Sequence, residues 1–189
     1  MGYEIERKFL IRRPSEIELF YIKSRTAVTE FAIEQTYLTS EEGTERRVRK
    51  RSNHVGSVQY FYTEKRKVTE LKRVENEKEI SEREYLELLK EADSSMKPLK
   101  KTRYVIPYRL CKFEMDVYPW DHARAILEVE IPYEDCKIDF PTFIDFIREV
   151  TDDPMFKNNN LARSHSFPDW NQQQKRRKHL SMIHSHPES

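Results

Sequence analysis

The chain of 189 residues fits a single domain, long enough for a barrel with flanking helices. Charged residues make up 35% of the chain and apolar residues only 37%, so either part of the chain is disordered or the chain folds around a polar interior. Aromatic residues make up 12%, which favours the folded alternative. The net charge of +1 excludes a global field that would attract nucleic acid or a membrane surface.

The scarcity of glycine and cysteine excludes several kinds of site. Only three glycines occur, which nearly excludes a glycine-rich phosphate cradle, so a phosphate ligand would be bound mainly by Lys and Arg side chains. Cys111 and Cys136 form neither a metal framework nor a disulfide scaffold, and we expect reduced thiols. With no secretory segment and no apolar run of ~20 residues, we expect a cytoplasmic protein without a membrane partner.

Strand patterns dominate the first half of the chain. Residues 3–11 alternate, with Glu4, Glu6 and Lys8 on one face, which is the period of a β-strand. The pattern of residues 14–24 is ambiguous and also fits a short helix. Further strands are expected at 31–39, 44–51, 57–66 and 72–80.

The second half combines helices with strands. Ser81 and Glu84 form a capping box that predicts a helix over 81–93. The spacing of apolar residues predicts a second helix over 141–150. Strands are expected at 101–107, 111–118 and 125–132.

The character of the chain changes at Pro168. From there to Ser189 the sequence is polar and basic, and it lacks a periodic apolar face. We therefore expect one domain over residues 1–167 and a flexible extension over 168–189.

Charged side chains recur at every second position in strand after strand. The acidic members are Glu4, Glu6, Glu75, Glu77, Glu114, Asp116, Glu128 and Glu130, and the basic members are Lys8, Arg47, Arg49, Lys65, Arg73, Lys101 and Arg103. The intervening positions are apolar where they can be judged, as at Phe113, Met115 and Val117. For any single strand, the simplest interpretation is a sheet with a solvated outer face.

Two features of the whole set favour charges that point inward. Glu-x-Glu occurs near both ends of the chain, and carboxylates two residues apart repel each other unless a cation lies between them. The basic pairs are also segregated from the acidic pairs by strand. A barrel with a charged lumen accounts for both, and it would bind a polyanion together with Mg²⁺ or Mn²⁺. Residues 44–51 are charged at both parities, so their inward face stays open.

At these residues the sequence resembles the CYTH superfamily, also called the triphosphate tunnel metalloenzymes. The resemblance covers about residues 2–165, and the segment Glu4-Ile5-Glu6-Arg7-Lys8 matches the ExExK signature of the family. The segment from Glu149 to Asp153 looks like the closing part of the short bacterial members. The other matching motifs are Gln35-Thr36-Tyr37-Leu38, Arg47-Val48-Arg49, Thr63-Glu64-Lys65, Arg73-Val74-Glu75-Asn76-Glu77, Lys101-Thr102-Arg103-Tyr104, Glu114-Met115-Asp116 and Glu128-Val129-Glu130.

The resemblance implies a mainly β (α+β) fold, an eight-stranded antiparallel β-barrel that forms a charged tunnel with flanking helices. It implies attack on the terminal phosphorus by a metal-activated water, with Lys8 or Lys101 assisting the leaving phosphate and Glu6 acting at the metal. The implied metal-facing carboxylates are Glu4, Glu6, Glu128 and Glu130, with Glu75, Glu77, Glu114 and Asp116 as further candidates. The implied phosphate-binding residues are Lys8, Arg47, Arg49, Lys65, Arg73, Lys101 and Arg103.

Several activities are compatible with such a fold. The short bacterial motif set favours hydrolysis of inorganic tripolyphosphate to pyrophosphate and phosphate. A class IV adenylate cyclase, or a thiamine or nucleoside triphosphatase, would need a stacking surface at the tunnel mouth, for which Trp120 and Tyr118 are the candidates. A non-catalytic polyphosphate- or nucleotide-binding module is a third alternative, although a receptor has little use for so many acids. We expect a small-molecule partner and no nucleic acid, with a monomer and a homodimer both open.

Overall fold

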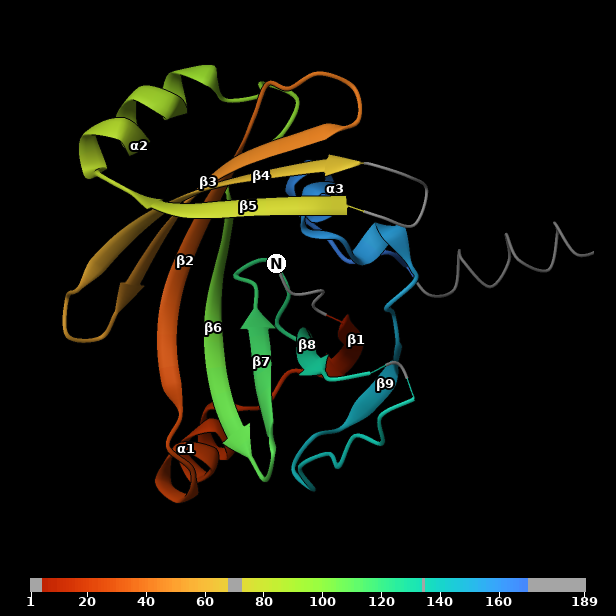
Figure 1. Ribbon diagram of the computed structural model, residues 1–189. Coiled ribbons are helices and arrows are strands. Elements are labelled where there is room, and N and C mark those ends of the chain that lie inside the picture. The colour runs from red at the N-terminus through yellow and green to blue at the C-terminus, as the bar shows by residue number, and fades with distance from the viewer. Residues whose placement is uncertain (1–4, 68–72, 134, 170–189) are drawn as a thin grey trace, which may run out of the picture.

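A curved antiparallel sheet forms the body of the protein (Figure 1). The computed structural model describes residues 5–67, 73–133 and 135–169. The strands are β1 (Ile5–Arg12), β2 (Thr29–Leu38), β3 (Thr44–Asn53), β4 (Val58–Lys67), β5 (Arg73–Ile80), β6 (Leu99–Tyr108), β7 (Cys111–Val117), β8 (Arg124–Ile131) and β9 (Phe146–Glu149), and the helices are α1 (Glu16–Arg25), α2 (Glu82–Leu88) and α3 (Asn158–Ser164). Short 3-10 turns follow α2 at Leu89–Glu91 and precede α3 at Pro154–Phe156. The strand order in the sheet is β5-β4-β3-β2-β6-β7-β8-β1-β9.

All of the predicted strands are present, with ends shifted by a few residues, but the helix predicted over 141–150 is wrong. Its second half is β9, which pairs with β1. The N–H of Val150 donates to the carbonyl of Lys8 (2.8 Å), and the ring of Phe146 packs edge-on against Phe9. Pairing along the edge of β1 therefore satisfies backbone groups that a helix would have satisfied internally.

The sheet has nine strands instead of the eight of the expected barrel. β5 and β9 are its edge strands, and no ladder among the described residues joins them. Because β9 pairs along the edge of β1, that edge is not free to pair with β5. Among the described residues, the architecture is therefore a curved antiparallel sheet with three α-helices, and its hydrogen-bonded ladders do not close it into the expected eight-stranded barrel.

Helices α1 and α2 both begin at capping boxes. At the start of α1, the backbone N–H of Ser15 donates to the carboxylate of Glu18 (2.7 Å), and the Ser15 side chain accepts from the Glu18 N–H. The ambiguous segment 14–24 is thus largely helical. α2 begins at the predicted capping box of Ser81 and Glu84, but it is shorter than predicted and ends in a 3-10 turn.

Apolar side chains build two cores on the side of the sheet that α1 and α2 cover, called here the outer face. α1 packs Leu19 and Ile22 against the larger core. α2 packs Tyr85 against the smaller one, whereas Leu86 of the same helix is exposed. The larger core includes Phe9, Ile11, Tyr104, Ile106, Phe113, Met115, Val117, Leu127, Val129 and Ile131, and the smaller one includes Leu38, Val48 and Ile80.

A third apolar cluster lies on the opposite, inner face and is called here the α3 cluster. Its strand members are Leu10, Tyr37, Leu99, Tyr118 and Ile126, and the segment after β9 covers them with Val150, Phe156, Leu161, Ala162 and Phe167. Asn159 of α3 also donates from its side-chain amide to the carboxylate of Glu45 on β3 (2.8 Å). The α3 cluster thus covers one end of the inner face and leaves the remainder to polar side chains.

Two further observations concern the described helices and the two cysteines. None of the helices in the described ranges is both long and apolar enough to cross a membrane. Cys111 and Cys136 are free thiols, each partly buried.

Candidate active site

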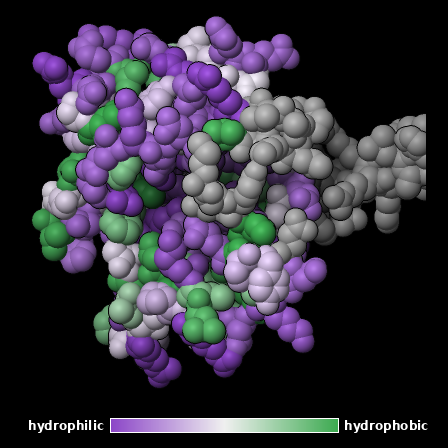
Figure 2. Space-filling view, viewed as in Figure 1, coloured by the Kyte–Doolittle hydropathy of each residue, from purple (hydrophilic) through white to green (hydrophobic). Residues whose placement is uncertain are grey.

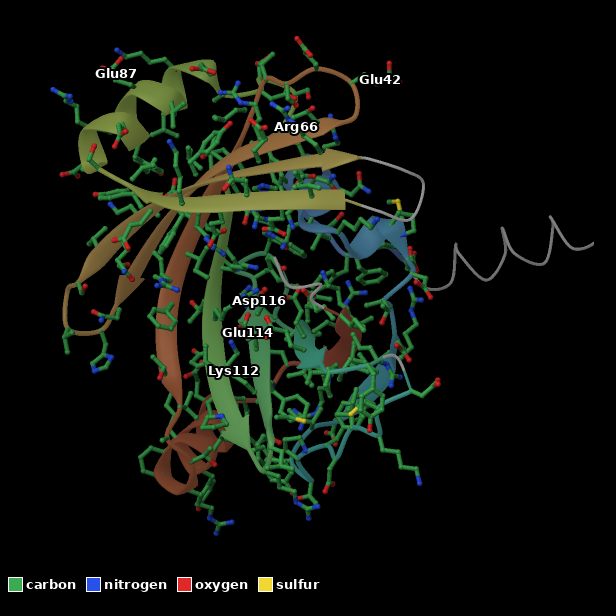
Figure 3. All side chains as sticks on the ribbon, in the orientation of Figure 1. Glu42, Arg66, Glu87, Lys112, Glu114 and Asp116 are labelled. Atoms are coloured by element: carbon green, nitrogen blue, oxygen red, sulfur yellow. The ribbon has the colours of Figure 1, made fainter. Side chains whose placement is uncertain are left out.

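Cross-strand partners place the alternating charges together on the inner face. Residues directly opposite each other in an antiparallel ladder point to the same side of the sheet. These pairs are Glu75 with Lys65, Glu77 with Thr63, Thr63 with Arg47, Arg49 with Gln35, Lys101 with Ile33, Arg103 with Asp116, Glu114 with Glu128, Glu128 with Lys8, and Glu130 with Glu6. Figure 3 shows Lys112, Glu114 and Asp116 in succession along β7. The register thus places these charged residues on one side of the sheet, and the set is called the charged face.

Arg103 binds three carboxylates on this face. Its Nε donates to Asp116 (2.6 Å), one Nη to Glu128 (2.8 Å) and the other Nη to Glu114. Lys101 also donates to Asp116, and both of these residues are buried. One arginine therefore links β6, β7 and β8 through charge-assisted hydrogen bonds.

Burial and the charges of neighbouring residues shift the pKa values of Lys101 and Glu128 in this network, and some of these effects oppose one another. Burial, together with the positive charge of Arg103, lowers the pKa of Lys101 to about 8, against the attraction of Asp116. Burial alone would raise the pKa of Glu128, but Lys8 and Arg103 outweigh it and hold that pKa well below its ordinary value. Glu128 is thus a fixed anion, whereas Lys101 is a cation that loses its proton under mildly alkaline conditions.

The ladder between β1 and β8 carries a lysine and three acids. The Nζ atom of Lys8 lies 2.7 Å from Glu128 and 3.7 Å from Glu6. Glu6 lies directly opposite Glu130 in the register. Desolvation by the surrounding protein, and then the charge of Glu128, raise the pKa of Glu6 to about 7. Since 46% of the Glu6 side chain stays accessible, its carboxylate is enclosed but reachable from solvent.

β3 brings arginines to another part of the charged face. An Nη atom of Arg49 donates to Glu77 (2.8 Å), and Arg47 lies 3.7 Å from Glu75, which also pairs with Lys65 (2.8 Å). The Nε atoms of Arg47 and Arg49 are buried, and neither has a hydrogen-bond partner among the described residues. Burial, and then the charge of Arg47, lower the pKa of Arg49 despite the presence of Glu77. The surrounding acids therefore leave these arginines incompletely satisfied.

The carboxylates predicted to face a metal are described only in part. Glu4 lies outside the described residues, as does the side chain of Arg73. Within the described ranges, no three or more His, Cys, Asp or Glu side chains are grouped so as to hold a metal ion. Arg103 forms ion pairs with Glu114, Asp116 and Glu128. The arginines of β3 form ion pairs with Glu75 and Glu77. In the part of the chain described, no arginine forms an ion pair with Glu6 or Glu130.

The aromatic residues expected at a tunnel mouth lie elsewhere. Tyr118 is buried in the α3 cluster, with its ring centroid 4.8 Å from that of Trp120. Trp120 in turn packs against Phe167. Tyr118 therefore offers no open stacking surface, and the partly buried ring of Trp120 packs against the α3 cluster. The register instead places Phe31 and Phe61 on the charged face.

The polar residues of the charged face that were not predicted as site residues include Gln35, Arg51 and Thr63. Thr63 donates its hydroxyl to Glu77 (2.9 Å), and Gln35 donates its amide to the hydroxyl of Tyr37 (2.7 Å). Arg51 continues an Arg-x-Arg-x-Arg pattern, which was a usable signal. Because its strand is charged at both parities, that signal did not identify the face.

Two surface pockets lie away from the cations of this face. One, of about 490 Å³, is next to α3 and is lined by Tyr37, Glu45 and Asn159 among others. The second, of about 470 Å³, lies between α2 and the strands beneath it and is lined by Tyr62 and Lys78 among others. Hydrophilic residues also cover most of the surface visible in Figure 2.

The proteins that this chain is found to resemble are solved structures. No family model matches the chain, and there is no significant match among curated proteins. Two solved structures of NE1496, one described as an inorganic triphosphatase and one as a hypothetical protein, share 27% identity with this chain at a TM-score of 0.56. The match with the triphosphatase structure covers 89% of this chain and 99% of NE1496.

Two more distant structures also match. PH1012 from Pyrococcus horikoshii OT3 has 18% identity and a TM-score of 0.48, over 70% of this chain and 80% of its own. HpAC1 from Hippeastrum, described with a dominant triphosphatase activity, has 13% identity and a TM-score of 0.46, over 68% of this chain and 80% of its own. Of the structures named here, NE1496 is similar enough to support an inference about function. In its motifs and in its similarity to NE1496, the chain resembles the CYTH superfamily and, within it, the short bacterial inorganic triphosphatases.

Proposed function

We propose that this protein hydrolyses inorganic tripolyphosphate to pyrophosphate and phosphate on its charged face. The observation that carries the proposal is the pair of incompletely satisfied arginines on β3, Arg47 and Arg49, which share that face with Lys8, Lys101 and Arg103. Arginine and lysine neutralise phosphate charge, and arginine does so bidentately. The similarity to the inorganic triphosphatase NE1496, over nearly the whole of both chains, supports the same class of substrate.

The proposal includes a tunnel that encloses the substrate. Its support is α3, which follows β9 along the chain and contacts β3 through Asn159 and Glu45. β9 and β3 lie far apart in the strand order, so this contact connects distant parts of the curved sheet. A substrate on the charged face would then be surrounded by strands, with the α3 cluster at one end.

The catalytic contribution of the chain is mainly charge neutralisation, which is the dominant effect in phosphoryl transfer. Arg47, Arg49 and Lys65 would bind one part of the substrate, and Arg103 another. Of the two lysines considered for the leaving phosphate, Lys101 fits better, because its pKa is lowered to about 8 and it can release a proton. In Lys8 the opposing effects of burial and of Glu128 leave the pKa raised.

Mg²⁺ or Mn²⁺ would fit the acids of the β1–β8 ladder. Glu6, Glu128 and Glu130 supply the hard oxygen donors that these ions prefer, and Glu4 lies two residues before Glu6 in the sequence. A cation would also relieve the repulsion between Glu6 and Glu128 that contributes to the raised pKa of Glu6. When bound, it would polarise the terminal phosphoryl group and activate a water molecule. Mg²⁺ typically takes few protein ligands and completes its shell with water and substrate phosphates, which suits this sparse set.

A phosphate-release assay tests the proposal. Tripolyphosphate, ATP and thiamine triphosphate are each incubated with Mg²⁺, with Mn²⁺ and with EDTA. We expect tripolyphosphate to be hydrolysed fastest and EDTA to stop turnover. A preference for thiamine triphosphate, or conversion of ATP to a cyclic product, would instead assign an organic substrate. Calorimetric binding of all three without turnover would identify a receptor.

A further inference from the structure

The arginines of β3 continue beyond the pair used above. Arg47, Arg49 and Arg51 occupy alternate positions on the same face of the strand, each about 6.6 Å from the next along it. Glu45, bound by Asn159 of α3, is the preceding member of the same face. Arg51 is therefore the arginine farthest along β3 from the end that α3 covers.

The surroundings of Arg51 hold its guanidinium in place without neutralising it. The group lies 4.9 Å from the ring centroid of Phe31 and 4.8 Å from that of Phe61, one on each neighbouring strand. An Nη atom donates to the side-chain carbonyl of Gln59 (2.6 Å), while the Nε atom is buried and has no hydrogen-bond partner in the described ranges. The amide of Gln59 lies in turn 3.4 Å from the carboxylate of Glu79, so this acid contacts Gln59.

Arg51 differs in this respect from the arginines beside it. Arg47 and Arg49 each form an ion pair with Glu77, whereas no carboxylate of the described residues lies within ion-pair distance of Arg51. Its positive charge also contributes to lowering the pKa of Arg49, after burial and the charges of Arg47 and Arg103. Arg51 thus adds uncompensated positive charge next to the residues proposed to bind the triphosphate.

The chemistry of this position favours an anion over an aromatic ring. Phe31 and Phe61 each have one ring face directed at Arg51, so a nucleobase or thiazolium ring would have to compete with the guanidinium. A phosphate group would be attracted to the same guanidinium, whose charge forms no ion pair with a carboxylate of the described residues.

We propose that Arg51, held between Phe31 and Phe61, forms a subsite for a fourth phosphate, so that the protein binds linear polyphosphates longer than three units. This inference rests on the proposed function for the position of the first three phosphates. It makes Arg51 a specificity residue, which contacts the part of a longer chain that lies outside the triphosphate site.

The test compares tripolyphosphate and tetrapolyphosphate on four forms of the full-length protein. Arg51→Met removes the charge and retains packing bulk, whereas Arg51→Lys retains the charge. Lys50→Met removes a charge from the adjacent position on the outer face of the same strand. Dissociation constants are measured by calorimetry in the presence of EDTA, and kcat/KM is measured in the presence of Mg²⁺. The unfolding temperature of each form shows whether it folds normally.

The measured quantity is the preference for tetrapolyphosphate over tripolyphosphate. We expect Arg51→Met to reduce this preference about tenfold, and Arg51→Lys to restore most of it, because a charge-assisted contact to the fourth phosphate is lost and regained. Lys50→Met should leave it unchanged. A purely structural role of Arg51 would lower the unfolding temperature and weaken both ligands equally.

Other outcomes separate the two proposals. A preference that Arg51→Met leaves unchanged, the absence of any such preference in the unmodified protein, or failure to bind either polyphosphate would overturn the subsite. Weakened binding of ATP alone in Arg51→Met would also overturn it, and would assign the position to a nucleoside. The expected shift in binding without hydrolysis of either polyphosphate would leave the subsite standing and overturn the hydrolase.

Discussion

Lys8 and Glu128 face each other across the β1–β8 ladder and form an ion pair of 2.7 Å. A cation proposed to bind phosphate is therefore already held by an acid proposed to bind metal. Removing either partner would leave a largely buried charge with less compensation, so variants of this pair would confound folding with catalysis. Glu6 is different, because its closest cation in the described residues is 3.7 Å away and nearly half of its side chain is accessible.

Glu6→Gln is therefore the cleaner test of the metal-binding acids. It removes a charge without changing side-chain volume, and we expect Mg²⁺-dependent phosphate release to fall at least about a hundredfold, with the unfolding temperature nearly unchanged. Glu34→Gln is the matched control, since Glu34 points to the other face of the sheet and pairs with Lys100. Full activity in Glu6→Gln would show that the metal assignment on β1 is wrong.

Arg49→Ala tests the phosphate-binding row. The side chain is largely buried, and its Nε lacks a partner, so we expect KM for tripolyphosphate to rise at least about tenfold. A smaller decrease in kcat should accompany it, because phosphate charge is neutralised most fully in the transition state. Steady-state kinetics on Arg49→Ala and on Lys50→Ala, from the opposite face of the same strand, provide the measurement. Equal effects of the two changes would count against a role of Arg49 at the substrate.

The lowered pKa of Lys101 predicts an alkaline limit to substrate capture. The free protein loses the Lys101 proton as pH rises through about 8, and with it a positive charge at the phosphate site, so kcat/KM should fall above that pH. Lys101→Met should lower kcat/KM and abolish this limb, because no proton remains to be lost. Profiles of kcat/KM between pH 6 and pH 10 for both proteins would show whether the decrease is lost in Lys101→Met. Circular dichroism at each pH is the control for folding. A limb that persists in Lys101→Met would belong to another group.

The α3 cluster should contribute measurably to stability. Leu161 is completely buried where the chain after β9 covers the inner face, so Leu161→Ala should lower the free energy of unfolding by roughly 2–5 kcal/mol through lost burial and the cavity left behind. Leu86→Ala, on the exposed side of α2, should change it by less than about 0.5 kcal/mol. Urea denaturation of both variants is the measurement. Equal midpoints of denaturation for the two variants would show that the packing of α3 does not stabilise the fold.

Local signals in the sequence were enough for much of the fold. Alternation at Glu6 and Lys8, and at Glu128 and Glu130, predicted two strands that the structure pairs with each other. The capping box at Ser81 predicted where α2 begins. These predictions succeeded because strand periodicity and helix capping depend on residues a few positions apart.

Longer-range pairing decided what local patterns left open. The apolar spacing over 141–150 suits a helix, but the edge of β1 is available to this segment, and backbone pairing there produces β9. This additional strand is also why the sheet has nine strands and not the eight expected. No property of residues 141–150 alone identifies the edge with which they pair.

The sequence by itself therefore determined which residues carry the charge, and the tertiary structure decided which of them meet. In β3, Arg46, Arg47, Arg49, Lys50 and Arg51 are all basic, and either parity could have faced inward. The ladders to β2 and β4 place Arg47, Arg49 and Arg51 on the charged face, with Arg46 and Lys50 on the other. A strand presents its two faces equally, so the direction of its side chains is decided only when neighbouring strands and their apolar cores are in place.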